Sequence, residues 1–178
     1  LANMVLDGLE REIRKACRKG ERVNFIRYAD DFIVTAANKE ILEERIMPLI
    51  ESFLKPRGLL LSPEKTMITH IDEGFDFLSQ NMRKFRGKFI TQPSKKAVMD
   101  RAEKIREIVK GHNGRSQESL IKKLNRTTRG WTNYHRHIQS SIAFSKLDTE
   151  FYQTLCKWGR RQNRNVTRKW LHKHYFRD

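Results

Sequence analysis

The sequence predicts an α+β protein in which a mixed helix-and-strand part, residues 1–92, precedes an all-helical part, residues 93–178. Short runs of β-branched and aromatic residues, typical of strands, occur only in the first part. After residue 92 the apolar residues recur at helical spacing instead. The first part carries 16 Lys+Arg against 14 Asp+Glu, and the second carries 21 against 7. This asymmetry suggests two parts with different functions.

Residues 1–19 are predicted to form one amphipathic helix that Gly20 ends. Its apolar residues recur every three or four positions: Met4, Val5, Leu9, Ile13 and Ala16. Residues 22–37 change to a strand pattern, in which two apolar runs flank Asp30 and Asp31. We expect a β-hairpin there, with the two acids at its centre.

Residues 38–55 return to helical spacing, with Asn38 as a suitable N-cap. Pro48 lies inside this pattern and should kink or split the helix, because proline lacks an N–H and clashes with the preceding turn. Short strands are then predicted at 59–61, 67–71, 75–78 and 88–91.

Three helices are predicted in the second part, over 95–110, 117–136 and 143–162, followed by a short helix around Trp170. Ser116 offers a helix start for the second of them. Because the loops between these helices are short, neighbouring helices should pack antiparallel in a small bundle.

The net charge of +16 points to a polyanionic partner, and nucleic acid fits better than an anionic membrane surface. No apolar run approaches the roughly 20 residues of a membrane span. The two cysteines lie far apart and form no disulfide framework or CxxC pattern. Two histidine pairs, 135/137 and 172/174, have a spacing that points apart on a helix, which disfavours zinc.

Asp30 and Asp31 are the sharpest local feature, because adjacent carboxylates repel and need a cation or water. Mg²⁺ prefers such hard oxygen ligands, and two ions can stabilise both oxygens of a phosphoryl transfer. The plain alternative is a solvated turn, in which aspartate is common.

Arg27–Val34 is similar to the YADD hairpin of reverse transcriptases, and Arg129–Tyr134 to the centre of a maturase-specific region. Several segments thus resemble, in chain order, the group II intron reverse transcriptase/maturase family. Leu1–Asn3 resembles the residues after the family's PQGG-type motif, and Gly58–Thr66 resembles a segment of its palm. Phe75–Leu78 resembles the start of the primer grip, and Pro93–Lys96 resembles the entry to the thumb. Phe144–Asp148 follows the maturase segment as in the family. The resemblance implies the C-terminal part of a polymerase palm, then a thumb and maturase helical domain.

The resemblance also implies roles for single residues. Asp30 and Asp31 would be catalytic ligands of Mg²⁺, with Mn²⁺ as an alternative, and Lys65 would reach the incoming triphosphate. Tyr28 would lie beneath the primer's 3′ nucleotide, while Phe77 and Leu78 would hold the primer. Each role has a plain alternative: a solvated lysine for Lys65, and packing within the sheet for the aromatic and aliphatic side chains.

Nucleic-acid backbone is the expected partner of basic residues in the second part, since phosphate contacts are sequence-independent. These residues are Lys95, Lys96, Arg101, Lys104, Arg129, Arg136, Arg160, Arg161 and Arg164, the last three at the spacing of one helix face. Trp131, Tyr134, Trp158 and Trp170 could stack on unpaired bases, although core packing is the favoured interpretation for the first three.

Two departures from the family pattern matter. Ser79 stands where a glycine usually follows the primer-grip Phe-Leu, and the fingers and first catalytic Asp are expected before residue 1, or on another chain. We therefore expect no polymerisation by residues 1–178 alone. The alternative to a polymerase is a maturase-only RNA-binding splicing cofactor; an unrelated basic DNA-binding protein is a third reading, which the collinear segments disfavour.

Expected partners are structured intron RNA, an RNA template with a DNA primer, and dNTPs, with no membrane partner; a dimer is an alternative assembly. The expected location is the cytoplasm of a bacterium, or an organelle in a eukaryote.

Overall fold

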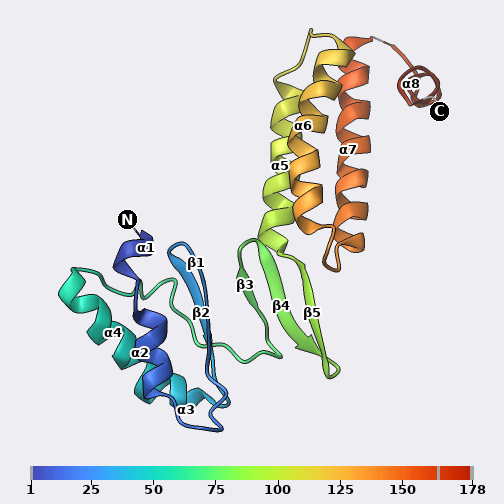
Figure 1. Cartoon of the computed structure of the whole chain (residues 1–178). Coiled ribbons are helices and arrows are strands. Elements are labelled where there is room, and N and C mark those ends of the chain that lie inside the picture. Colours follow the sequence, from blue (N-terminus) through green and yellow to red (C-terminus); the bar gives the residue numbers. More distant parts are fainter. Residues whose placement is uncertain (1, 164, 177–178) are drawn as a thin grey trace. The chain divides into compact units, whose positions relative to one another are not determined.

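The computed structural model describes residues 2–163 and 165–176, and its chain forms two compact units, Leu1–Ile68 and Thr69–Asp178 (Figure 1). Both units contain helices and antiparallel strands, so the predicted α+β class is confirmed. Each unit is described by itself.

The first unit opens with two helices, α1 (Ala2–Val5) and α2 (Leu9–Ala16), where one helix over 1–19 was predicted. Gly8 separates them, because its backbone is left-handed with φ 84°. The spacing of the apolar residues continues across this glycine and so conceals the break. Leu9 and Ile13 are fully buried in the unit's core.

The predicted hairpin is confirmed as strands β1 (Asn24–Tyr28) and β2 (Asp31–Thr35), which pair antiparallel. One face packs on the helices of the unit through Phe25, Phe32 and Val34. The opposite face carries the cross-strand pair Tyr28 and Asp31 and is open to solvent.

The predicted helix over 38–55 runs as α3 (Lys39–Ile41), a π-helical segment η1 (Leu42–Ile46), α4 (Met47–Leu54) and a 3-10 turn η2 (Lys55–Arg57). Asn38 caps it as predicted, since its side chain accepts a 3.2 Å hydrogen bond from the Ile41 N–H. The predicted disruption by Pro48 takes the form of this π-helical segment, which precedes the proline and shifts the hydrogen-bond register. Ile46, Ile50 and Leu54 complete the core around α2.

The strands predicted at 59–61 and 67–71 are wrong. Residues 59–62 and 66–70 have no regular structure, and the Ser62 carbonyl accepts hydrogen bonds from the N–H groups of Lys65 and Thr66 instead. Leu60 is 88% exposed. A strand needs a neighbour for its backbone hydrogen bonds, and in the described residues none pairs with these segments.

The second unit begins with the sheet β3 (Phe75–Phe77), β4 (Gln80–Phe85) and β5 (Lys88–Pro93), in that order. The strands predicted at 75–78 and 88–91 are confirmed with small shifts at their ends. Strand β4, the centre of the sheet, was missed because Gln80–Phe85 is mostly polar and lacks an apolar alternation.

The predicted bundle is confirmed as α5 (Lys95–Lys110), α6 (Gln117–His135) and α7 (Ser141–Gln162), which lie side by side in Figure 1. Ser94 and Ser116 cap α5 and α6 through their side-chain oxygens. The core of the bundle contains Ile105, Ile108, Val109, Leu120, Leu124, Leu147 and Trp158.

The last helix, α8 (Arg168–Tyr175), corresponds to the one predicted around Trp170. It packs on α7 through Leu171, which is fully buried. A Cβ at Gly159 would lie 2.9 Å from the Leu171 Cδ2 atom. A larger residue at position 159 would therefore force the Leu171 side chain to shift.

Candidate nucleic-acid interface and metal site

The two acids lie at the end of the β1–β2 hairpin. Tyr28 and Asp31 form the closing cross-strand pair, and Ala29 and Asp30 form the two-residue turn. Ala29 has φ 56°, a left-handed conformation that is uncommon for a residue with a Cβ. The Arg27 side chain donates a 3.3 Å hydrogen bond to the Ala29 carbonyl, which steadies the turn.

Asp30 and Asp31 are both exposed, and in the described part of the chain neither forms an ion pair. Two unpaired carboxylates offer the hard oxygen donors that Mg²⁺ takes, so the donor chemistry fits this ion. Among the described residues, no cluster of three or more His, Cys, Asp or Glu side chains forms around them or elsewhere. Metal binding by the pair stays a prediction.

Lys65 lies in the turn at 63–65, and its side chain is exposed. In the part of the chain that the structure describes, it forms no ion pair, so its ammonium group faces solvent. The geometry is compatible with a triphosphate contact and equally with a solvated turn lysine, and the catalytic role stays a prediction.

The predicted primer grip is a second tight turn. Phe77 and Gln80 close it, and its two central residues are Leu78 with φ 49° and Ser79 with φ 65°. Both are left-handed, which is the geometry that favours glycine. A glycine in place of Ser79, the residue usual in the family, would adopt it without strain.

Two contacts from the helical part of the unit fix this turn. The Tyr134 hydroxyl donates a 2.8 Å hydrogen bond to the Leu78 carbonyl, and the Ser94 N–H donates a 2.9 Å bond to the Ser79 carbonyl. The first contact joins residues 56 positions apart. Sequence reasoning named Tyr134 only as a stacking or core residue and missed it as an anchor.

The aromatic residues divide by burial. Trp158 is 4% exposed and its indole N–H donates a 3.1 Å hydrogen bond to the His112 carbonyl, so core packing is confirmed for it. Trp131 is half-buried and packs against the same core. Tyr134 is 48% exposed, contrary to the core packing predicted for it, because its hydroxyl reaches out to the Leu78 turn. Trp170 is 39% exposed, with its ring stacked 4.4 Å from His174.

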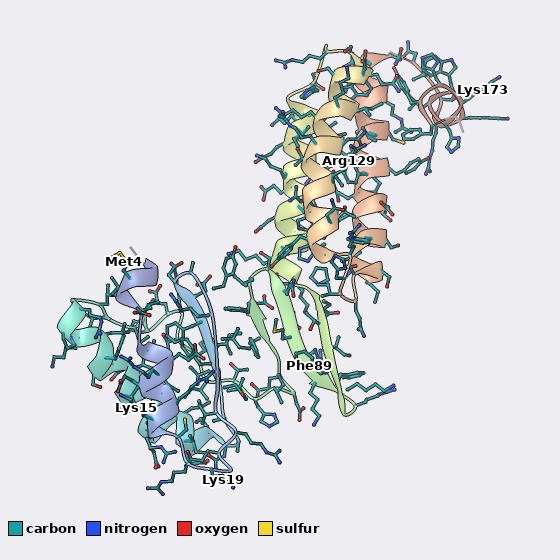
Figure 2. All side chains as sticks on the ribbon, in the orientation of Figure 1. Met4, Lys15, Lys19, Phe89, Arg129 and Lys173 are labelled. Carbon is teal, nitrogen blue, oxygen red and sulfur yellow. The ribbon has the colours of Figure 1, made fainter. Side chains whose placement is uncertain are left out.

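Most of the predicted basic contacts are exposed and form no ion pair among the residues that the structure describes. They are Lys95, Lys96, Arg129 (labelled in Figure 2), Arg136, Arg160 and Arg161. Lys104 is exposed but pairs with Glu107 at 3.0 Å. Arg164 lies outside the described residues. Helix α7 ends at Gln162, so the predicted helical spacing does not continue past that residue.

Arg101 has a different environment from the other predicted contacts. It is half-buried, its guanidinium donates a 3.2 Å hydrogen bond to the Thr127 carbonyl, and it lies 5.7 Å from the Trp131 ring centre. Burial lowers the pKa of this guanidinium from its usual value. These contacts tie α5 to α6, and a direct role in RNA binding stays a prediction.

Sequence reasoning also missed His135 as a buried group. Its ring is fully buried, and neither ring nitrogen has a hydrogen-bond partner among the described residues. It packs against Trp131, with ring centres 4.3 Å apart. Burial first, and the nearby charge of Arg101 second, lower the pKa of the imidazole.

Comparison with known families supplies the decisive observation. The family described as "Reverse transcriptase (RNA-dependent DNA polymerase)" matches residues 1–82, and "Group II intron, maturase-specific domain" matches residues 99–176. The chain belongs to the group II intron reverse transcriptase/maturase family. The order of the two matches is the order in which the motifs occur along this chain.

A curated relative of this reverse transcriptase/maturase chain is Protein YkfC of Escherichia coli (strain K12), 31% identical over 91 residues. The match covers 49% of this chain and 23% of that protein. The matched part of this chain thus spans about a quarter of the relative's length. Within the described residues, no helix has the length and apolarity needed to cross a membrane.

Proposed function

We propose that this chain carries the YADD part of a polymerase that copies RNA into DNA, together with the helical part that binds intron RNA and promotes splicing. The observation that carries the proposal is the exposed Asp30–Asp31 pair, presented at a tight hairpin turn without a cationic partner in the described residues. The proposed partners of the chain are template RNA, primer DNA, dNTPs and structured intron RNA.

Asp30 and Asp31 would hold Mg²⁺, with Mn²⁺ as the alternative; such ions stabilise the attacking and leaving oxygens of a phosphoryl transfer. The protein's contribution is to position these carboxylates. The antiparallel pairing of β1 and β2 fixes Asp31 beside Tyr28 on the open face of the hairpin. The Tyr28 ring, 65% exposed, is thereby available to a nucleotide next to the carboxylates.

The turn at Leu78 and Ser79 would contact the primer strand. Hydrogen bonds from Tyr134 and Ser94 hold its two carbonyl groups, so the turn's conformation is fixed before any primer binds. A pre-formed contact of this kind lowers the entropic cost of positioning the primer end.

Exposed, unpaired cations support the RNA-binding half of the proposal. Lys95 and Lys96 begin α5, Arg129 and Arg136 lie on and just after α6, and Arg160 lies in the last turn of α7. Such residues attract phosphate without reading sequence. Their contacts weaken as the salt concentration rises, because releasing the counterions bound to the nucleic acid is then less favourable.

Primer extension by the intact protein on an RNA template with Mg²⁺ tests the polymerase proposal. We expect Asp30→Asn and Asp31→Asn each to reduce extension by more than about a hundredfold, because each removes a metal-binding charge. Asp7→Asn, another exposed acid of the first unit, is the matched control and should leave extension unchanged. Extension that survives the Asp30→Asn/Asp31→Asn double substitution would contradict the proposal.

A maturase-only role, in which the chain binds intron RNA while the RNA performs the chemistry, is the second candidate. It is favoured by the cations of the second unit, whose exposure does not depend on the Asp pair. Both candidates predict that the Asp30→Asn/Asp31→Asn protein binds intron RNA like the wild type. Only primer extension by the intact protein distinguishes the two candidate functions. A wild-type protein that promotes splicing but extends no primer supports the maturase-only role.

A further inference from the structure

The hairpin formed by β4 and β5 ends in a tight two-residue turn, Arg86–Gly87. Both residues have positive φ, 49° and 77°, which is the turn geometry that matches the twist of paired strands. We call residues 83–89 the hairpin tip. In Figure 1 this tip is the end of the sheet farthest from α5, α6 and α7. The tip is therefore a defined, projecting element.

Two aromatic rings are exposed on the hairpin tip. Phe85 is 46% exposed and Phe89, labelled in Figure 2, is 62% exposed. Phe85 pairs across the strands with Lys88, and Phe89 pairs with Lys84. Because neighbouring residues of a strand point to opposite faces, each face of the hairpin presents one ring beside one lysine.

The charge of this region has a single sign. No Asp or Glu occurs between Asp76 and Asp100, whereas six Lys or Arg residues do. In the described chain, the four cations of the tip form no ion pair: Arg83, Lys84, Arg86 and Lys88. A surface of unpaired cations and exposed rings is complementary to an anionic, aromatic partner.

Two of these cations lie against one ring. The guanidinium carbon of Arg83 is 5.0 Å from the Phe85 ring centre, and that of Arg86 is 5.3 Å from it. These cation–π contacts hold the ring and the charges together without a carboxylate. A base stacked on the exposed part of Phe85 would therefore have positive charge next to its own phosphate.

We infer that the hairpin tip binds unpaired nucleotides of RNA, with bases stacked on Phe85 and Phe89 and phosphates near the flanking cations. The inference rests on the proposed RNA-binding function and adds a contact site on the sheet, apart from the helical cations. Unpaired nucleotides are required because a duplex hides the faces of its bases, whereas single strands and loops expose them.

Fluorescence anisotropy with the full chain tests this inference, using a single-stranded oligouridine RNA and a fully paired RNA duplex of equal length. We expect Phe85→Leu and Phe89→Leu each to weaken single-strand binding by about tenfold, and duplex binding by less than about twofold. Arg83→Gln with Arg86→Gln should weaken binding of both RNAs and reduce its dependence on salt.

Two substitutions serve as matched controls. Met99→Ala removes another exposed apolar side chain of the second unit, and Lys19→Gln removes an exposed lysine of the first unit. Neither should change the preference for single strands. The double variant Phe85→Leu/Phe89→Leu removes both rings. If it fails to fold, the single variant Phe89→Leu remains informative, because the Phe89 ring is the more exposed of the two.

The outcomes separate the inference from the function on which it rests. Wild-type protein that binds neither RNA overturns both. Wild-type protein that binds single strands, with Phe85→Leu/Phe89→Leu binding them equally well, overturns the hairpin site alone. Equal losses on single strands and duplex also overturn it, because stacking on unpaired bases predicts a difference between the two RNAs.

Discussion

The hydroxyl of Tyr134 donates a 2.8 Å hydrogen bond to the carbonyl oxygen of Leu78, joining the C-terminal end of α6 to the turn between β3 and β4. A residue of the maturase segment thus holds the turn that resembles the primer grip. The contact links two motifs that are distant in sequence, and within the second unit it makes the turn's position depend on α6.

Tyr134→Phe removes this bond and keeps the ring. We expect a loss of about 0.5–1.5 kcal/mol in the free energy of unfolding, toward the lower end because Tyr134 is half exposed. Urea denaturation measures the loss, and hydrogen exchange should become faster at the backbone of Leu78 and Ser79. Tyr28→Phe is the control, since its hydroxyl forms no hydrogen bond among the described residues. Unchanged exchange at the turn in Tyr134→Phe would show that the bond does not hold it.

The sequence predicted elements whose signals are local. Residue type and spacing predict the β1–β2 hairpin, the caps at Asn38 and Ser116, and the extents of the bundle helices. Prediction from the sequence failed where pairing with a distant segment decides whether residues form a strand. Polar β4 is a strand because β3 and β5 flank it, whereas apolar residues 59–61 have no such neighbour among the described residues.

The same distinction applies to the candidate site. The position of Asp30 and Asp31 at a hairpin turn could be predicted, because it depends on eight consecutive residues, Arg27–Val34. The anchoring of Leu78 by Tyr134 could not, since nothing in either segment specifies a contact across 56 residues. The burial of His135 was equally hidden, because the two residues on each side of it in the sequence are exposed.

Salt dependence tests the proposed phosphate contacts at the end of α7. Arg160→Glu/Arg161→Glu should weaken RNA binding by more than about tenfold at low salt, and should reduce the slope of log affinity against log salt by about 0.7 for each lost contact. Lys104→Glu is the comparison, because this lysine already pairs with Glu107. Its effect on affinity should be smaller. Equal affinity in the double arginine variant and the wild type, measured by filter binding, contradicts these contacts.

The ion pair between Glu21 and Arg45 predicts a dependence of stability on acid. The Arg45 hydrogen bond, with a further one from the Arg18 N–H, lowers the pKa of Glu21 below its ordinary 4.5. The unfolded state therefore takes up this proton at a higher pH than the folded state. Stability from the pair is complete above about pH 4.5 and is lost as the pH falls through the lowered folded pKa.

Urea denaturation of wild type and Glu21→Gln over this pH range measures the effect. The difference in stability between them should be constant near neutral pH and should shrink in acid. Glu64→Gln, an exposed acid without an ion pair in the described residues, should show little difference at any pH. A difference for Glu21→Gln that persists unchanged in acid would show that the pair's charge is not its source.

His135 predicts a second pH dependence in a different range. Burial, and then the charge of Arg101, hold the pKa of its imidazole below the usual 6.5, so the folded state keeps the ring neutral to a lower pH than the unfolded state does. As the pH falls below 6.5, the unfolded chain binds the proton first, and the free energy of unfolding decreases until the folded pKa is reached. His135→Leu preserves an apolar filling of the site and should flatten this decrease. Substitution of an exposed neighbour, His137→Leu, should leave the decrease intact.

The same variant, His135→Leu, should cost little stability at neutral pH, because both ring nitrogens of His135 lack hydrogen-bond partners among the described residues. A large loss of stability at neutral pH would mean that the imidazole makes a polar contact on which the fold depends.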